Sequence, residues 1–369
     1  MRYLIVCDLH ASNHPIFPID EGGVNGHLRL VERLINTTLP SWWSGTPTTI
    51  VFLGDLMECV YRQNKVHVGI QEMLISGIQY LRSIGFSVAV IAGNHDAGHK
   101  GSWLTVHKDK FDILCDVDQS LPLSDKYNDP FERTVVLIGH SHDKEVTQKA
   151  IEQALVYRGD GKLLIMGHFG VTGSAVENGG VYRWDDGVDL SGIKHVDCIG
   201  QMILGHVHHG TPTDKPLVYA GLPLPYSWVV DTTAYADATG TILALDTNGL
   251  TRRTTGAPRF VSCTVKDWVA GYSNRVYAGD FVRLVATFDE RDEAMMIQSS
   301  TVGVHIRPIY TSGVPDNVVA RLRGEASKTT ARAVVAEDAY NAYLDFQAQK
   351  GGVPYTRDDM IAELKKVLG

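Results

Sequence analysis

The feature that most constrains this chain is a series of short apolar runs that each end abruptly in polar residues. Six of them lie in the first 210 residues: RYLIVCD, TTIVFLGD, FSVAVIAGNHD, RTVVLIGHSHD, KLLIMGHFG and QMILGHVHH. Between the runs, apolar residues recur at helical spacing, as at Leu28, Val31, Leu34 and Ile35. Strands that are apolar throughout are buried on both faces, so this alternation predicts a layered α/β domain over residues 1–255.

The pattern changes after residue 255. Runs such as RFVSCTVKD, DFVRLVATFDE and GVHIRPIY read as β-strands without long helices between them, which predicts a small second domain over residues 256–312. Residues 313–369 are alanine-rich and helical in pattern, broken by Gly351, Gly352 and Pro354 before a last helix capped by Thr356. A chain of 369 residues is long enough for such a multi-domain arrangement.

Composition places the chain among ordinary globular proteins and predicts a cytoplasmic location. The first apolar run is much shorter than the core of a signal peptide, and no run approaches the roughly 18 apolar residues of a membrane span. Five scattered cysteines without a C-x-x-C pair argue against a disulfide framework or a zinc ribbon. The net charge of -8 argues against nucleic-acid binding by bulk electrostatics, although a basic stripe or bound cations reverse the field locally.

Candidate metal ligands follow the apolar runs. Because ligands bind outside the carboxyl ends of strands in such sheets, we expect these side chains to converge at one edge. Carboxylates, imidazoles and one amide oxygen suit a divalent first-row metal better than calcium. They are too many for one ion, and two ions about 3.5 to 4 Å apart sharing a carboxylate suit phosphoester hydrolysis. The candidates are Asp8, His10, Asp55, Asn94, His168, His206 and His208.

The segments CDLH, LGDLME, AGNHDAG, MGHFG and LGHVHH resemble the five motifs of the calcineurin-like metallophosphoesterases. Within that superfamily the whole chain resembles the SbcD-type DNA repair nucleases, whose eukaryotic and archaeal counterpart is the meiotic-recombination-eleven nuclease. The stretch PLVYAGLPLPYSW is also similar to that branch. The resemblance implies a four-layer α/β/β/α sandwich with a small α+β capping domain and C-terminal helices.

The resemblance also implies residue roles. One ion would be held by Asp8, His10, Asp55 and His208, and the other by Asp55, Asn94, His168 and His206, with Asp55 bridging. His95 would protonate the leaving 3′ oxygen, a task that imidazole suits because it titrates near neutral pH. Asp96 would orient this loop or His95 itself. Manganese is the first candidate metal, with magnesium, iron and zinc as alternatives.

The expected function is that of a manganese-dependent DNA nuclease, an exonuclease with endonuclease activity, in double-strand end processing. The helical segment 66–82 is expected to pack on the sheet. The resemblance implies a homodimer formed through a helical surface of the first domain, and an SbcC-type ATPase bound by the C-terminal helices. The chain length is compatible with a bacterial or phage origin, and hence with a host cytoplasm. Two alternatives remain: a phosphoesterase acting on nucleotides, cyclic nucleotides or phosphoproteins, and a metal-binding scaffold without turnover.

Two further features are left open by the sequence. The segment IGHSHD places His140 and His142 in another G-H-x-H pattern, which is either a plain loop or a contact to DNA or to a metal-bound group. Glu58, three residues after Asp55, is interpreted as a carboxylate near a helix start rather than a ligand.

Overall fold

The structure is a computed structural model of the full chain. It describes residues 2–311 except 15, 59–67, 99–100, 125–126, 128, 158–161, 174–186, 209, 227–228 and 231–239. The predicted C-terminal helices therefore lie outside the described residues. Residues 1–286 and 290–309 form one compact unit.

The first sheet has six strands in the order β14-β13-β1-β2-β3-β6. Its parallel part consists of β1 (Arg2–Val6), β2 (Thr48–Leu53), β3 (Ser87–Ile91) and β6 (Ile113–Cys115). The chain returns much later to add β13 (Thr241–Asp246) antiparallel to β1, followed by the edge strand β14 (Gly249–Thr254). Three of the predicted apolar runs are thus neighbours in one sheet.

The second sheet has five strands in the order β11-β10-β9-β8-β7. Four of them are parallel: β8 (Thr134–Ile138), β9 (Leu163–Gly167), β10 (Ile199–Leu204) and β11 (Leu217–Tyr219). The edge strand β7 (Ser120–Pro122) runs antiparallel to β8. The remaining predicted runs therefore form the centre of this sheet.

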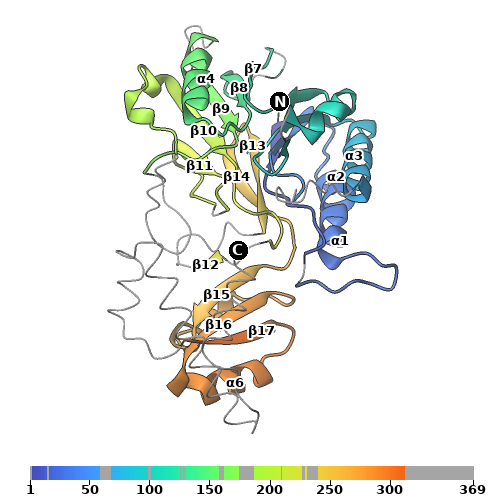
Figure 1. The fold of residues 1–369 in the computed structure, drawn as a ribbon, viewed down its shortest axis with the longest axis vertical. Helices are drawn as coiled ribbons and strands as arrows, with labels where there is room; N and C mark the ends of the chain where they lie inside the picture. Colours follow the sequence, from blue (N-terminus) through green and yellow to red (C-terminus); the bar gives the residue numbers. More distant parts are fainter. Residues whose placement is uncertain are drawn as a thin grey trace, which may run out of the picture. The chain divides into compact units, whose positions relative to one another are not determined.

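Helices cover the outer faces of the two sheets (Figure 1). On β1, Tyr3 and Ile5 pack in the core between the sheets, whereas Leu4 and Val6 pack in the core shared with α1 (Gly26–Arg33) and α3 (Val68–Ser83). The helix α4 (Lys144–Tyr157) closes the far side of the second sheet through Ile151 and Ala154. The predicted α/β/β/α sandwich is confirmed, and the two-sided burial explains why its strands are apolar throughout.

Shorter elements complete this part. A π-helical turn (Leu34–Thr38) joins α1 to α2 (Leu39–Ser41), and a 3₁₀ segment (Trp103–Lys110) follows the small hairpin of β4 (Ala97–Gly98) and β5 (Gly101–Ser102).

A third sheet follows in the order β12-β15-β16-β17. Its strands are β12 (Val229–Val230), β15 (Phe260–Thr264), β16 (Phe281–Thr287) and β17 (His305–Thr311). Two helices, α5 (Val265–Val269) and α6 (Arg291–Ser300), lie between the strands in sequence. The expectation of strands without a long intervening helix therefore fails at α6, which buries Ala294 and Ile297 but exposes Met295 and Met296. The domain boundaries at 255 and 312 stay predictions.

Among the described residues, every helix is too short or too polar to cross a lipid bilayer.

Candidate metal centre

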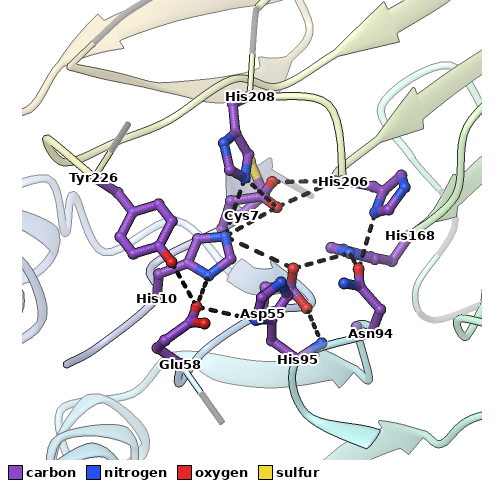
Figure 2. A network of polar contacts seen from close by, with 12 residues as sticks. Cys7, His10, Asp55, Glu58, Asn94, His95, His168, His206, His208 and Tyr226 are labelled. Atoms are coloured by element: carbon purple, nitrogen blue, oxygen red, sulfur yellow. Dashed lines mark hydrogen bonds and ion pairs between the residues drawn. The ribbon is translucent and has the colours of Figure 1, made fainter. Parts of the chain in front are cut away.

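The candidate ligands lie just beyond the carboxyl ends of strands from both sheets. Asp8 follows β1, Asp55 follows β2 and Asn94 follows β3 in the first sheet, while His168 follows β9 and His206 follows β10 in the second. Because these strands are parallel neighbours within their sheets, their ends meet at one edge. Figure 2 shows the side chains pointing toward one another across the gap between the two sheets.

One group of ligands gathers around His10. Its Nε2 atom lies 3.1 Å from Nε2 of His208 and 3.9 Å from Oδ1 of Asp8. The same Asp8 oxygen lies 4.0 Å from Nε2 of His208. Oδ2 of Asp55 is 3.7 Å from Nε2 of His10, which places it at the border of this group.

The other group gathers around the amide oxygen of Asn94. This Oδ1 atom lies 3.0 Å from Nε2 of His168 and 2.9 Å from Nδ1 of His206. Oδ2 of Asp55 lies 3.3 Å from Nε2 of His168, so one carboxylate oxygen reaches both groups (Figure 2). The structure thus brings all seven candidate ligands together, in the same two groups that the motif resemblance implies.

The nitrogen and oxygen atoms of the candidate ligands are arranged to bind a cation rather than to form hydrogen bonds with one another. Nδ1 of His168 donates to the carbonyl of Leu53 at 2.6 Å, so its Nε2 atom faces the oxygens of Asn94 and Asp55, where a cation would take the place of the proton that this nitrogen otherwise carries. Likewise Nδ1 of His10 faces the Glu58 carboxylate, which turns the Nε2 lone pair toward His208. Lone pairs that converge on lone pairs repel unless a cation lies between them, and mixed nitrogen and oxygen donors suit a divalent first-row metal.

Burial and charge adjust the protonation of these ligands. Burial opposes ionisation of Asp55, yet His168 and His10 hold its pKa well below the usual range. Burial also lowers the pKa of His168, but Asp55 and Asp8 outweigh it and raise the value to about 9. Burial, followed by neighbouring imidazoles, lowers the pKa of His206 to about 2 and of His208 to about 3. These last two rings are therefore neutral at neutral pH, which is the form that binds metals.

Four ligand residues adopt left-handed backbone conformations. The φ angles are 49° at Asp8, 43° at His10, 50° at Asp55 and 77° at His206. This region is uncommon for residues other than glycine, although aspartate and histidine enter it more readily than most. The sharp turns fold the side chains back over the strand ends, and the backbone N–H of His206 then donates to both oxygens of Asp8 at 3.2 Å.

His95 and Asp96 have different surroundings. The backbone N–H of His95 donates to Oδ1 of Asp55 at 2.8 Å, and its imidazole is 31% exposed beside the ring of His10. The buried Asp96 carboxylate accepts from the N–H groups of Leu56 and Gly93 and from Nε1 of Trp103. Of the two roles predicted for Asp96, these bonds match the orientation of the loop.

Two residues in this network escaped the sequence reasoning. Glu58 is interpreted there as a helix-start carboxylate, but the structure places its Oε2 atom 2.8 Å from Nδ1 of His10 and 3.0 Å from Nδ1 of His95. Tyr226 donates its hydroxyl to the same oxygen at 2.7 Å and stacks on His10 with ring centroids 4.0 Å apart. The only signals were that Glu58 shares a loop with Asp55 and that Tyr226 lies in the stretch PLVYAGLPLPYSW.

His140 and His142 lie next to the ligand cluster. The His140 ring is buried, with its centroid 6.0 Å from that of His206 and 6.1 Å from that of His168. Its Nε2 atom is 3.4 Å from Nδ1 of His142, and burial, followed by His168, lowers its pKa to about 4. Both interpretations of this pair remain open.

Comparison with known proteins gives one family match. Residues 1–210 match the family model described as calcineurin-like phosphoesterase. No curated protein sequence matches the chain.

Three solved structures are similar at low sequence identity. A dimetal phosphatase from Danio rerio is 12% identical, with a TM-score of 0.44, and the match covers 70% of this chain and 97% of that one. A protein from Staphylococcus aureus described as a 5′-nucleotidase, in complex with α-ketoglutarate, is 13% identical, with a TM-score of 0.39 and coverage of 69% and 52%. A 5′-nucleotidase precursor from Thermus thermophilus is 12% identical, with a TM-score of 0.33 and coverage of 69% and 53%. The match thus spans about half the length of the two nucleotidase chains.

Proposed function

Because this chain belongs to the calcineurin-like phosphoesterase family, we propose that it is a phosphoester hydrolase that works with two divalent metal ions. The observation that carries the proposal is the convergence of seven donor side chains from two sheets into two groups, with the Asp55 carboxylate reaching both. A scaffold that only binds metal has no need of a half-buried imidazole such as His95 beside the ligands.

Each ion would have its own ligands. Asp8, His10 and His208 would hold one, Asn94, His168 and His206 the other, and Asp55 would contact both. When bound, two such ions activate water and neutralise charge on the phosphoryl oxygens. Manganese is the proposed metal, with magnesium, iron and zinc as alternatives, because the donor set suits first-row ions.

His95 is the proposed general acid. Its imidazole is accessible at 31% exposure and lies against His10 and Asp55, next to where a phosphoester would reach the ions. A proton on Nε2 would pass to the oxygen of the departing group, a contribution of roughly 10² to 10⁴ in rate.

Two substrate classes compete. Among the described residues, the side chains labelled in the polar network of Figure 2 include no lysine or arginine, which are the side chains that usually bind nucleic-acid phosphates. This favours a nucleotide, cyclic nucleotide or phosphoprotein as substrate. The finer proposal of a DNA nuclease in double-strand end processing is supported instead by the third sheet, since a hydrolase of small molecules has no evident need for it.

The experiment is hydrolysis of a substrate panel in manganese by the wild-type chain and by Asp55→Asn and His95→Asn. The panel contains end-labelled duplex DNA, bis-p-nitrophenyl phosphate, nucleoside monophosphates, cyclic nucleotides and a phosphopeptide. We expect Asp55→Asn to lose at least about 100-fold in rate on whichever substrate is cleaved, and His95→Asn to lose as much on substrates whose leaving oxygen needs a proton but less on bis-p-nitrophenyl phosphate. A wild-type protein that binds manganese but cleaves none of these would overturn the proposal, and preference for duplex DNA would decide for the nuclease.

The partners remain proposals as well. A homodimer through a helical surface of the first domain and an SbcC-type ATPase on residues 313–369 rest on the motif resemblance alone. Mass determination in solution tests the first, and cleavage of duplex DNA with and without an added SbcC-type ATPase tests the second.

A further inference from the structure

Arg252 reaches from the first sheet to the main chain at the end of the second. It lies on β14 opposite Leu243 of β13, whose side chain packs in the core between the sheets, so Arg252 points to the same side. Its Nη1 atom donates to the carbonyl of Ala220 at 2.6 Å. Its Nη2 atom donates to the carbonyls of Thr211 and Tyr219 at 2.7 Å and 3.0 Å.

The acceptors of these hydrogen bonds are uncharged. Among the ion pairs of the described residues, Arg133 pairs with Asp129 and Arg259 with Asp280, but none includes Arg252. Burial lowers the pKa of Arg252 to about 10, so the half-buried guanidinium keeps its charge at neutral pH. A charge in such surroundings is costly unless it is hydrogen-bonded, and its planar fork here holds carbonyls of two chain segments at once.

Both segments held by Arg252 adjoin the metal ligand His208. Thr211 lies three positions after His208, and its N–H donates to the carbonyl of Tyr219 at 3.1 Å, which closes the neck of the loop. Tyr219 ends β11, three positions before Leu222. The N–H of Leu222 donates to the carbonyl of His208 at 3.2 Å, so the main chain of the ligand is tied to the strip that Arg252 holds.

A second side chain restrains the same strip. The thiol of Cys7, which directly precedes Asp8, donates to the carbonyl of Gly221 at 2.8 Å. Arg252 and Cys7 together therefore hold the three consecutive carbonyls of residues 219–221, immediately before the amide that bonds to His208.

We propose that Arg252 is a positioning residue for one of the two metal ions, the one that Asp8, His10 and His208 would hold. It fixes the neck of the loop and thereby the main chain of His208. The His208 imidazole then stays where its Nε2 atom lies 3.1 Å from Nε2 of His10. This role rests on the proposed function, because it assigns a residue to the proposed metal centre.

Charge alone predicts the opposite effect on metal binding. A guanidinium near a metal site repels the cation, so its removal would strengthen manganese binding if electrostatics dominated. If positioning dominates, removal leaves His208 less well held and weakens binding, as happens when groups that orient a ligand are lost. A contact that only stabilises the fold would not single out one ion. The sign and the selectivity of the effect separate these three roles.

The test compares two substitutions of Arg252 with the wild-type chain. Arg252→Met removes the fork and the charge, while Arg252→Lys keeps the charge. Arg253→Met is the matched control, because this neighbour on β14 has its Cζ atom 5.9 Å from the ring centroid of Trp42, in the core on the other face of the sheet. His208→Gln and its combination with Arg252→Met complete a double-mutant cycle. Calorimetric manganese titration gives the affinity of each ion, and amide hydrogen exchange in metal-free protein reports the order of the loop.

We expect Arg252→Met to weaken binding of one manganese ion by roughly 10- to 100-fold and of the other by less than about 3-fold. Combined with His208→Gln, it should add little to the loss, because Arg252 acts through that ligand. In Arg252→Met, exchange of the Leu222 amide should accelerate at least about 10-fold more than exchange in β9. Arg252→Lys should recover only part of the affinity, since one nitrogen replaces the two that hold separate segments. Arg253→Met should match the wild type.

Stronger manganese binding in Arg252→Met, equal weakening of both ions, additive losses in the double variant, or full recovery by Arg252→Lys would each overturn the inference. If Arg252→Met does not fold, Arg252→Lys decides, and wild-type affinity with wild-type exchange at Leu222 would contradict the role. If the wild type binds two manganese ions yet hydrolyses no phosphoester, the proposed function fails, while the binding data still judge Arg252. If it binds no manganese, both proposals fail.

Discussion

Gly93 lies so close to Asp55 that one added methyl group would displace the bridging carboxylate. A Cβ at Gly93 would lie 2.2 Å from Oδ1 of Asp55 and 2.4 Å from its backbone nitrogen. We expect Gly93→Ala to weaken manganese binding and to reduce hydrolysis by more than about 100-fold, at an overpacking cost of roughly 1–3 kcal/mol in the free energy of unfolding. Calorimetric manganese titration checks this, with Gly192→Ala as control because its nearest neighbour is 3.9 Å away. Wild-type affinity in Gly93→Ala would contradict the crowding argument.

At the scale of residues, the sequence predicted which side chains would come together, because each candidate ligand follows the end of an apolar strand within four residues. His95 was identified by the same rule, being next to Asn94. Glu58 and Tyr226 could not be found that way, since they are 168 positions apart and their hydrogen bond exists only once both sheets have formed. Sequence order reveals groups at strand ends, but it does not reveal which loop side chains meet them.

At the scale of elements, Asn25 caps the N-terminus of the helix α1, and its side chain accepts a hydrogen bond from the N–H of His27. The His27 side chain, in the first turn of this helix, is fully buried. Burial, followed by His14, lowers the pKa of His27 to about 4. The unfolded chain therefore takes up this proton at a higher pH than the fold does, so stability is lost as pH falls from about 6.5 to about 4.

Replacing His27 by glutamine removes this titration. We expect the unfolding free energy of wild type minus that of His27→Gln to decrease by up to about 3 kcal/mol between pH 7 and pH 4. Urea unfolding of both proteins at several pH values measures it, and the titrations of groups remote from His27 cancel in the difference. Parallel pH curves would show that His27 is already protonated in the fold.

The helices and strands that could be predicted from the sequence are those whose side chains are extensively buried. The predicted apolar runs became central strands because both faces of each are covered, as at β1 and β9, where every residue is buried. The helix predicted over 66–82 is seen as α3 within the described residues. The helix α6 was missed because it buries only two side chains, Ala294 and Ile297, which is too weak a pattern to recognise.

At the scale of the whole molecule, the metal centre joins two sheets that otherwise meet through an apolar core. Asp8, Asp55 and Asn94 follow strands of one sheet, and His168 and His206 follow strands of the other. Because the ligands come together only when both sheets have formed, a cation binds the folded chain and not the unfolded one. Manganese at 100 times its dissociation constant should therefore add about 2.7 kcal/mol per site to the free energy of unfolding.

Thermal unfolding across a manganese titration checks this linkage. We expect the melting temperature of the wild type to rise by several degrees, roughly 1–2 °C for each kcal/mol in a chain of 369 residues. Asp55→Asn should lose most of the rise, because the shared ligand is weakened for both ions. An equal rise in that variant would place the bound manganese elsewhere.

The sequence did not predict which strands would be neighbours in a sheet. The apolar runs indicated a layered α/β domain, but nothing in them told that the chain would return at β13 to pair antiparallel with β1. Such pairings depend on contacts between segments more than 200 positions apart, as between Tyr3 and Leu245. The third sheet has the same origin, since the two-residue strand β12 pairs with β15 across a stretch of about 30 positions.

Asp8, His10, Asp55 and His206 have left-handed backbone conformations. These conformations influence which substitutions would accumulate if the activity were lost. For most L-residues such turns cost roughly 1–2 kcal/mol each, and glycine relieves the strain while asparagine tolerates it. Once hydrolysis is no longer selected, drift at these four positions should run toward glycine, because glycine eases the backbone and removes the ligand. A descendant that has lost the activity would then be recognisable by glycine at positions where its ancestors held metal.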